Sequence, residues 1–186
     1  MSTYPIHDTD TAPEGSRAIL EATKKSLGAI PNLFGVFASS PAVLEGYTTL
    51  SGLLEKSTAF DETERQTLFL SISAENDCRY CVAAHSAISA AKRVSDDVVD
   101  AVRSGAPLPS PKLEALRTFA LEVVRNRGWV GEEAQAAFFE AGYTQRHVLE
   151  VVLAVAFKTI SNYTNHVSGT PLDSMFEAKA WEPAAV

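Results

Sequence analysis

The chain has 186 residues, 46% of them hydrophobic, and its 23 acidic residues outnumber its 16 basic ones to give a net charge of -7. This length suits one domain whose hydrophobic core is large enough to fold without disulfide bonds. The negative charge excludes a broad positive field that would attract phosphate backbones, so we expect no nucleic-acid partner.

The first sixty residues contain the signals of three helices. Pro13 precedes an apolar helical face that Gly28 follows at the position where a helix would end. Ser40 and Pro41 give an N-cap followed by proline at the first helical position. These signals predict helices over residues 14–27, 32–37 and 41 to about 57.

The next segment contains a helix boundary between two apolar runs. Asp61 and Glu64 have the spacing of a capping box, which begins a helix that runs to about residue 75. Asn76-Asp77 interrupts this helix and caps the next one, which runs to about residue 93. Cys78 is therefore expected in the first turn of a helix, where free backbone N–H groups and the helix dipole favour a thiolate.

The second half of the chain continues in helices. A breaker-rich loop, Gly-Ala-Pro-Leu-Pro-Ser-Pro, separates two of them at 105–111. The valine-rich stretch after Thr144 has some strand character, but its length and its cap favour a helix. The predicted helices cover residues 95–105, 111–124, 132–141 and 145–167, with a short helix and an arm in the tail.

The predicted fold class is therefore all-α, a multi-helix bundle. We expect a single all-α domain over residues 1–186. Within it, residues 61–168 hold the core with both cysteines, residues 1–60 form N-terminal helices, and residues 169–186 form a C-terminal arm. The N-terminus lacks a basic start followed by an apolar run, and no stretch approaches the ~20 apolar residues of a membrane span. We expect a cytoplasmic protein with no membrane partner.

Residues 78–85, Cys-Arg-Tyr-Cys-Val-Ala-Ala-His, are the most chemically specific part of the sequence. On a helix, Cys78, Cys81 and His85 fall within a sector of roughly 60°. A disulfide between cysteines this close removes little unfolded-state entropy, so a structural role has a weak physical motive. In a reducing compartment such a pair is more often redox-active or metal-binding.

The residues alone leave open which sulfur reacts. The helix terminus favours Cys78 as the low-pKa thiol, whereas an imidazole four residues further on favours Cys81, with His85 as its base. A dithiol that reduces a peroxide needs one cysteine to become a sulfenic acid and another to condense with it. Both cysteines therefore have a task whichever one attacks.

Other functions stay open at this point. The cysteines and His85 could hold zinc, although a closed site needs further ligands and the sequence offers only His7, His147 and His166. A binding or redox-sensing scaffold and a decarboxylase-like or hydrolase-like activity in the same pocket are further alternatives. For Asn162, Asn165 and His166, near a helix end, capping or a subunit contact is favoured over catalysis.

Taken together, these segments resemble the carboxymuconolactone decarboxylase and alkyl hydroperoxidase D-like family, in its peroxidase-related branch. The match is carried by Ser-Ile-Ser-Ala-Glu-Asn-Asp-Cys-Arg-Tyr-Cys-Val-Ala-Ala-His at 71–85 and by Gly-Ala-Ile-Pro-Asn-Leu-Phe at 28–34. Further matching pieces are Ser-Pro at 40–41 and the segment 162–173.

The resemblance implies a homo-oligomeric all-α enzyme, a dimer, trimer or hexamer, that reduces hydroperoxides with a dithiol. By the same resemblance Cys81 would attack the peroxide, Cys78 would resolve the sulfenic acid, and His85 would belong to a proton relay. No bound cofactor is implied. The expected partners are a small hydroperoxide and a thiol reductant protein, with an external thiol or lipoyl-type group as the reductant.

One position departs from the family pattern. The relay of the family usually includes a glutamate twelve positions before the first cysteine, and this chain has Gln66 there. Glutamine forms hydrogen bonds but does not accept a proton at neutral pH. Glu62 lies one turn earlier on roughly the same face and is a candidate substitute, while Glu64 is better explained by the capping box.

Overall fold

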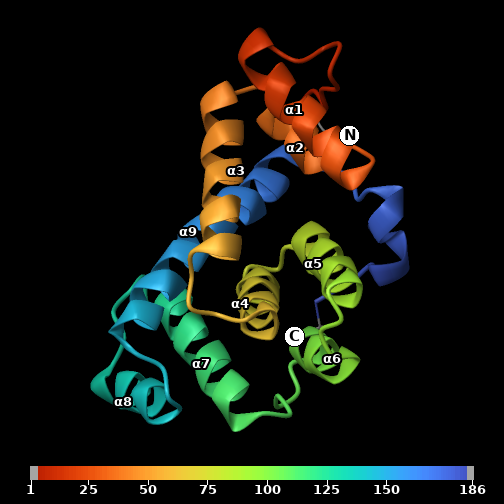
Figure 1. The fold of residues 1–186 in the computed structure, drawn as a ribbon. Coiled ribbons are helices and arrows are strands. Elements are labelled where there is room, and N and C mark those ends of the chain that lie inside the picture. The colour runs from red at the N-terminus through yellow and green to blue at the C-terminus, as the bar shows by residue number, and fades with distance from the viewer. Residues whose placement is uncertain (1–3, 184–186) are drawn as a thin grey trace.

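The computed structural model describes residues 4–183, and over this range the chain forms α-helices and one 3₁₀-helix and no strand. The predicted all-α fold class is therefore confirmed (Figure 1). The elements are α1 (Glu14–Leu27), α2 (Asn32–Phe37), α3 (Pro41–Lys56), α4 (Glu62–Glu75), α5 (Arg79–Ala91), α6 (Asp96–Ser104), α7 (Pro111–Arg125), α8 (Glu132–Glu140), α9 (Gln145–Ser168) and η1 (Ser174–Lys179).

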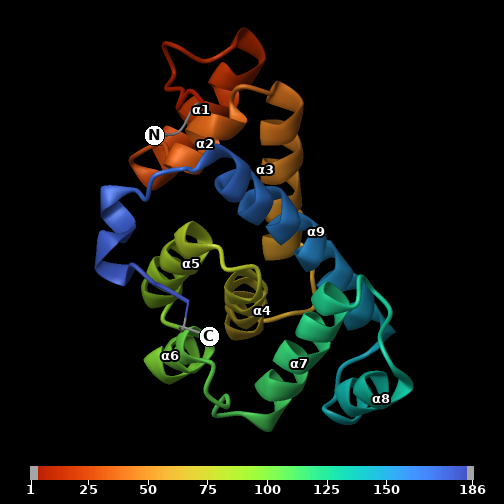
Figure 2. The same ribbon diagram turned by 180° about the vertical axis from the view of Figure 1, so that it is seen from behind.

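Helix α4 lies at the centre of the lower part of the molecule, with α5, α6, α7 and α9 around it (Figures 1 and 2). Its residues 66–73 are all buried, as expected for a helix that is covered on every side. The predicted capping box fixes its start, because the Glu64 N–H donates to Asp61 Oδ1 at 2.8 Å and the Asp61 N–H donates to Glu64 Oε2 at 3.0 Å.

The predicted helix boundaries agree with the structure to within two residues, with one difference at the cysteines. Asp77 has a φ of 51°, and this left-handed residue reverses the chain between α4 and α5. Cys78 is consequently the N-cap of α5 and not a residue of its first turn. The short helix predicted in the tail is the 3₁₀-helix η1.

Helix α9 and the arm that follows it bring distant parts of the sequence to α4 and α5. Helix α9, from its capping box at Thr144 to Gly169, runs diagonally past α3, α4 and α7 (Figure 2). The valine-rich stretch is thus helical, as predicted. The arm after α9 returns to α5, where Phe176 packs edge-on against the Tyr80 ring. Asp173 accepts hydrogen bonds from the Tyr80 hydroxyl and from the Asn32 N–H, which ties the arm to α5 and α2.

The larger of two hydrophobic clusters contains both cysteines. Three aromatic rings in it join three helices. The ring of Tyr47 in α3 stacks on that of Phe157 in α9, with 4.5 Å between the ring centres, and the Phe157 and Phe69 ring centres are 5.3 Å apart, Phe69 being in α4. The smaller cluster lies between α4, α5, α6 and the start of α7. Within residues 4–183, no helix is both long enough and apolar enough to cross a bilayer.

Candidate active site

The two cysteines lie at the start of α5, 3.4 Å apart, and both are free thiols. The Cys78 N–H donates to the Ser73 carbonyl at 2.9 Å, which holds the N-cap against the end of α4. Cys78 is 1% exposed and Cys81 is 2% exposed. A disulfide needs the sulfurs about 2.0 Å apart, so a small movement would join this pair.

The two thiols have opposite acidities. Burial tends to raise the pKa of Cys81, but the hydrogen bond from Cys78, the positive charge of Lys158 and hydrogen bonds from Ser161 and Asn162 outweigh burial and lower it below its ordinary value. The hydrogen bond to Cys81, followed by burial, raises the pKa of Cys78. The structure therefore favours a Cys81 thiolate beside a Cys78 thiol over the acidic Cys78 that the helix terminus suggested.

One face of α9 covers the sulfurs. Lys158, Ser161, Asn162 and Asn165 share this face through their i, i+3, i+4 and i+7 spacing, and all four are buried. The Asn165 amide donates to Cys81 Sγ at 3.3 Å and lies 3.7 Å from Cys78 Sγ. The two asparagines are thus neither helix caps nor surface contacts, which corrects the favoured interpretation of the sequence.

On this face, the Asn162 amide is oriented by contacts at both its oxygen and its nitrogen. Its amide oxygen accepts from Asn76 at 3.0 Å, and its nitrogen lies 3.4 Å from Ser73 Oγ. His166, the third member of the predicted cluster, is exposed and stacks near Tyr163. The spacing in the sequence identified the group, but only the packing of α9 on α5 separates the buried asparagines from the exposed histidine.

Lys158 is the functional candidate that sequence reasoning missed. Its side chain is fully buried, and its Nζ has no hydrogen-bond partner among residues 4–183. The ammonium lies 5.9 Å from the centre of the Phe69 ring and 5.6 Å from that of Phe157. A buried charge is costly unless another group compensates it, and the electrostatic partner here is Cys81. The available signal was a lysine within an apolar helical run.

Burial and the charge of Lys158 lower the pKa of His85 well below 6.5, so the imidazole is neutral. Its Nδ1 lies 3.0 Å from Gln66 Oε1, and Gln66 Nε2 donates to Glu62 Oε1 at 2.9 Å. Because a carboxylate only accepts hydrogen bonds, Glu62 fixes the amide of Gln66 with its oxygen toward His85. His85 Nδ1 therefore carries the hydrogen, and Nε2 keeps a lone pair that can accept a proton.

One part of the expected relay needs correction. Among the described residues no hydrogen bond joins His85 to either sulfur, so the direct contact expected from the i, i+4 spacing of Cys81 and His85 is not made. Gln66, which was expected to form hydrogen bonds without accepting a proton, links His85 to Glu62. Glu64 lies outside this chain, because its carboxylate binds Tyr143 and Lys112 besides the Asp61 cap.

Glu62 is ionised at neutral pH. Burial tends to raise its pKa, but hydrogen bonds from Gln66 and Arg65 and the nearby charges of Arg65 and Lys92 outweigh burial and lower the pKa. Arg65 Nη2 lies 2.7 Å from Glu62 Oε2, and Lys92 Nζ lies 3.9 Å from the same oxygen. The structure thus places a stable carboxylate at the outer end of the chain Glu62, Gln66 and His85.

The hydrogen bonds that link Glu62, Gln66 and His85 predict how substitutions of Glu62 and Gln66 affect the rate of Cys81 oxidation. Glu62→Gln is expected to slow oxidation of Cys81 roughly tenfold or more, because an amide no longer fixes Gln66 and the protonated nitrogen of His85. Gln66→Glu is expected to retain or increase the rate, since a carboxylate on Nδ1 makes Nε2 more basic. Stopped-flow oxidation kinetics test both, with the exposed Glu45→Gln as the control. Equal rates in all four proteins would exclude a functional relay.

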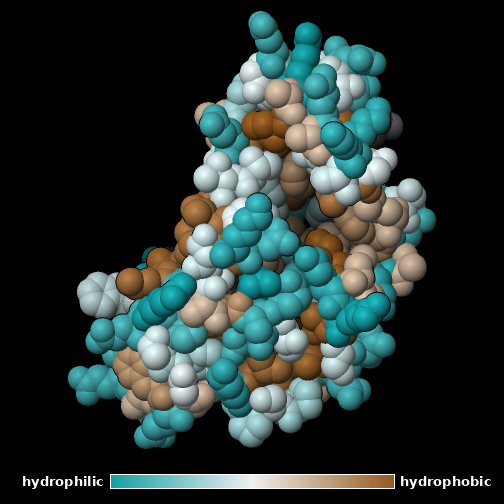
Figure 3. All heavy atoms as spheres, in the orientation of Figure 1, coloured by the Kyte–Doolittle hydropathy of each residue, from teal (hydrophilic) through white to brown (hydrophobic). Residues whose placement is uncertain are grey.

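A cavity of about 450 Å³ opens beside Cys81. Figure 3 shows the surface hollowed between the upper helices and α5, with apolar side chains at the edge of the hollow. Cys81, His85, Gln66 and Lys158 belong to its wall, whereas Cys78 does not. Most of the remaining wall is apolar or aromatic, from Leu33, Phe34, Tyr47, Phe69, Tyr80, Phe157, Met175 and Phe176. Half-exposed Glu55 and Lys92 mark its mouth.

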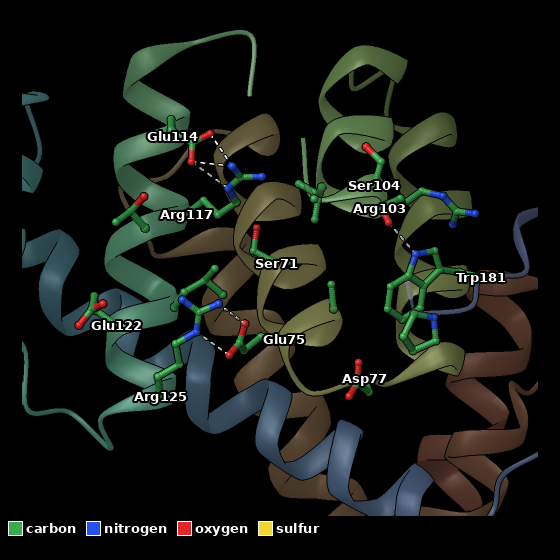
Figure 4. A pocket seen from close by; sticks show the side chains of 16 residues that line it. Ser71, Glu75, Asp77, Arg103, Ser104, Glu114, Arg117, Glu122, Arg125 and Trp181 are labelled. Carbon is green, nitrogen blue, oxygen red and sulfur yellow. Dashed lines mark hydrogen bonds and ion pairs between the residues drawn. The ribbon is translucent and has the colours of Figure 1, made fainter. Parts of the chain in front are cut away.

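A second cavity of about 400 Å³ lies between α4, α6, α7 and the C-terminal arm (Figure 4). Four of its charged side chains form two ion pairs, Arg125 with Glu75 and Arg117 with Glu114. The Trp181 indole closes one side by donating to the Arg103 carbonyl at 2.8 Å. No cysteine or histidine belongs to its described wall, so the cavity beside Cys81 is the candidate active site.

Among residues 4–183, no group of three or more histidine, cysteine, aspartate or glutamate side chains is arranged to hold a metal ion. His7, His147 and His166, the reserve ligands considered from the sequence, therefore do not complete a site with the cysteines. His147 instead accepts a hydrogen bond from the Thr144 N–H at the start of α9.

Comparisons with known proteins show which family and which solved structures this chain resembles. Residues 41–122 match the model of the carboxymuconolactone decarboxylase family. A search of the curated proteins found no match. An alkylhydroperoxidase AhpD core protein from Ralstonia eutropha JMP134, described as an uncharacterized peroxidase-related protein, has a similar structure, with a TM-score of 0.85, 27% identity and coverage of 98% of both chains.

Two further solved structures share the fold. A peroxidase-related protein from Silicibacter sp. TM1040 has a TM-score of 0.80 and 18% identity, covering 95% of this chain and 93% of its own. The debrominase Bmp8, in complex with 2,3,4-tribromopyrrole, has a TM-score of 0.79 and 14% identity, covering 96% and 97%. The resemblance predicted from the sequence is confirmed, because residues 41–122 match the carboxymuconolactone decarboxylase model and the chain shares its fold with an alkylhydroperoxidase AhpD core protein.

Proposed function

We propose that the protein is a dithiol peroxidase that reduces organic hydroperoxides. The observation that carries the proposal is the position of Cys81 in the wall of a largely apolar cavity, 3.4 Å from Cys78, and the lowered pKa of Cys81 favours its thiolate. The thiolate attacks the terminal oxygen of the hydroperoxide, the O–O bond breaks, and the alkoxide that leaves takes up a proton to become an alcohol. Cys78 then displaces water from the Cys81 sulfenic acid to form a disulfide.

The disulfide needs two electrons from an external dithiol. No bound cofactor takes part in this cycle. Cys81 is the sulfur that belongs to the cavity wall, so a reductant reaches the disulfide through the cavity. A slender thiol, such as a lipoyl-type group carried by a partner protein, fits this route better than a cysteine on a flat protein surface. Attack on Cys81 would release Cys78 as the leaving thiol.

Steady-state turnover tests the proposal. The protein should consume cumene hydroperoxide with a soluble dithiol such as dihydrolipoamide, and the alcohol should form in a one-to-one ratio to oxidised dithiol. Heat-denatured protein with the same thiols is the control. Peroxide loss no faster than in the control, with Cys81 still open to alkylation, would contradict the function.

The aromatic wall of the cavity favours one second candidate, reduction of an organic halide. The debrominase Bmp8 shares the fold, and a cavity of about 450 Å³ accommodates a small halogenated ring. In this reaction the Cys81 thiolate takes the halogen, the ring carbon takes a proton, and Cys78 displaces halide to form the same disulfide. Halide release from a brominated pyrrole, without peroxide, distinguishes the two functions.

We also propose that the protein acts in the cytoplasm as a homo-oligomer. Support for assembly comes from an exposed apolar stripe on α9, where Leu149 is 71% exposed, Val152 50%, Tyr163 54% and Val167 71%. Their spacing places them along one face of the helix, opposite the face that covers the cysteines. Light scattering of the purified protein measures whether it is a dimer, a trimer, a hexamer or a monomer.

A further inference from the structure

Lys158 has hydrogen-bonding capacity that the protein itself does not use. An ammonium group has three donors, and the Nζ of Lys158, on a fully buried side chain, has no acceptor among residues 4–183. The thiolate of Cys81 compensates its charge through space without a hydrogen bond. The unused donors are therefore available to an atom that enters the cavity.

The other charged groups of the cavity wall are already engaged. Arg65 binds Glu62 and the Phe60 carbonyl, and Lys92 binds Glu55 at the mouth. His85 is neutral, and its one N–H points to Gln66. Within the described part of the wall, Lys158 is the cation that can meet a negative charge beside Cys81.

Peroxide reduction creates such a charge. When the Cys81 thiolate takes the terminal OH of a hydroperoxide, the electrons of the O–O bond go to the second oxygen, which leaves as an alkoxide. An alkoxide is a poor leaving group in an apolar cavity unless a cation or a proton donor meets it. The rings of Phe69 and Phe157, whose centres lie within 6 Å of Nζ, give the ammonium apolar surroundings.

We propose that Lys158 is a catalytic residue that protonates the departing alkoxide oxygen, and that the site therefore takes alkyl hydroperoxides with apolar bodies. This inference rests on the proposed peroxidase function. The proton balance closes: Lys158 gives its proton to the alkoxide, and it regains one when the reduced Cys81 thiol ionises. The net reaction converts a hydroperoxide and two thiols into an alcohol, water and a disulfide.

The leaving group provides the test. A peracid releases a carboxylate, which needs no acid, whereas cumene hydroperoxide releases an alkoxide, which does. The variant is Lys158→Met, which keeps the length and removes the charge, and the control is Lys25→Met, which removes an exposed charge on α1. Oxidation of Cys81 by both oxidants and alkylation by iodoacetamide are followed by stopped flow at a pH where alkylation has levelled off.

In Lys158→Met the ratio of the peracid rate constant to the cumene hydroperoxide rate constant is expected to rise by roughly 10²-fold or more, while Lys25→Met leaves it unchanged. Glutamine is a neutral hydrogen-bond donor of similar size, so Lys158→Gln should also raise this ratio. This second variant replaces Lys158→Met in the test if the methionine variant does not fold. Equal slowing of both oxidants and of alkylation would overturn the inference while leaving the peroxidase function intact. Wild-type protein that is alkylated but reacts with neither oxidant would overturn both.

Discussion

Replacing Cys81 with serine is expected to abolish hydroperoxide reduction, and replacing Cys78 with serine is expected to leave one rapid oxidation per molecule. Cys81 is the sulfur of the cavity wall and the one held as a thiolate by Cys78, Lys158 and Asn165. A serine hydroxyl is a far weaker nucleophile toward the O–O bond. Without Cys78, the sulfenic acid on Cys81 forms but has no neighbour to condense with.

The pH dependence of this first oxidation follows the ionisation of Cys81. The pKa of Cys81 is lowered from 9.0, so the thiolate persists as the pH falls through neutrality, and the rate declines only below the lowered pKa. Cys78→Ala removes the hydrogen bond that lowers the pKa of Cys81 and should move the decline to higher pH, whereas Cys78→Ser keeps a donor. Rapid mixing and a sulfenic acid trap measure both effects. Full turnover in Cys81→Ser would assign the attack to another group.

Replacing His85 with alanine is expected to slow Cys81 oxidation by roughly 10²-fold to 10⁴-fold, the usual contribution of a positioned acid or base. The change removes the neutral proton acceptor of the cavity and leaves Gln66 Oε1 without the hydrogen bond from His85. The ring also packs on Phe69 at 5.1 Å, so thermal unfolding is measured in parallel to separate lost packing from lost chemistry.

The pH profile of the His85 effect has a definite sign. Because burial and Lys158 hold the pKa of His85 well below 6.5, the imidazole stays neutral through the whole neutral range. The ratio of wild-type to His85→Ala rates should therefore be constant from about pH 8 to below pH 6.5 and fall only when the imidazole becomes protonated. Exposed His166→Ala is the matched control. A ratio near one at every pH would remove His85 from the reaction.

Local sequence signals were sufficient for the helices because caps and breakers act within a few residues. Asp61 with Glu64 fixes the start of α4, and Thr144 fixes that of α9. Cys78 and Cys81 lie together for the same local reason, since side chains three positions apart on a helix are neighbours. The left-handed Asp77 changed only the exact start of α5.

The groups that set the acidity of the site were not predictable in this way. Lys158 and Asn165 are more than seventy residues from Cys81 in the sequence, and their contact with the sulfurs depends on how α9 packs on α5. Helical spacing also placed His85 beside Cys81, but spacing does not decide which neighbour an imidazole chooses. In the structure it turns toward Gln66, whose orientation Glu62 determines.

Mass spectrometry after one equivalent of hydroperoxide tests the central claim most directly. The protein is treated with cumene hydroperoxide, digested without reduction, and compared with an untreated sample. The peptide that contains both Cys78 and Cys81 should lose two hydrogens, and the count of free thiols should fall from two to none. A treated protein that consumes the peroxide and keeps two free thiols would contradict the dithiol mechanism.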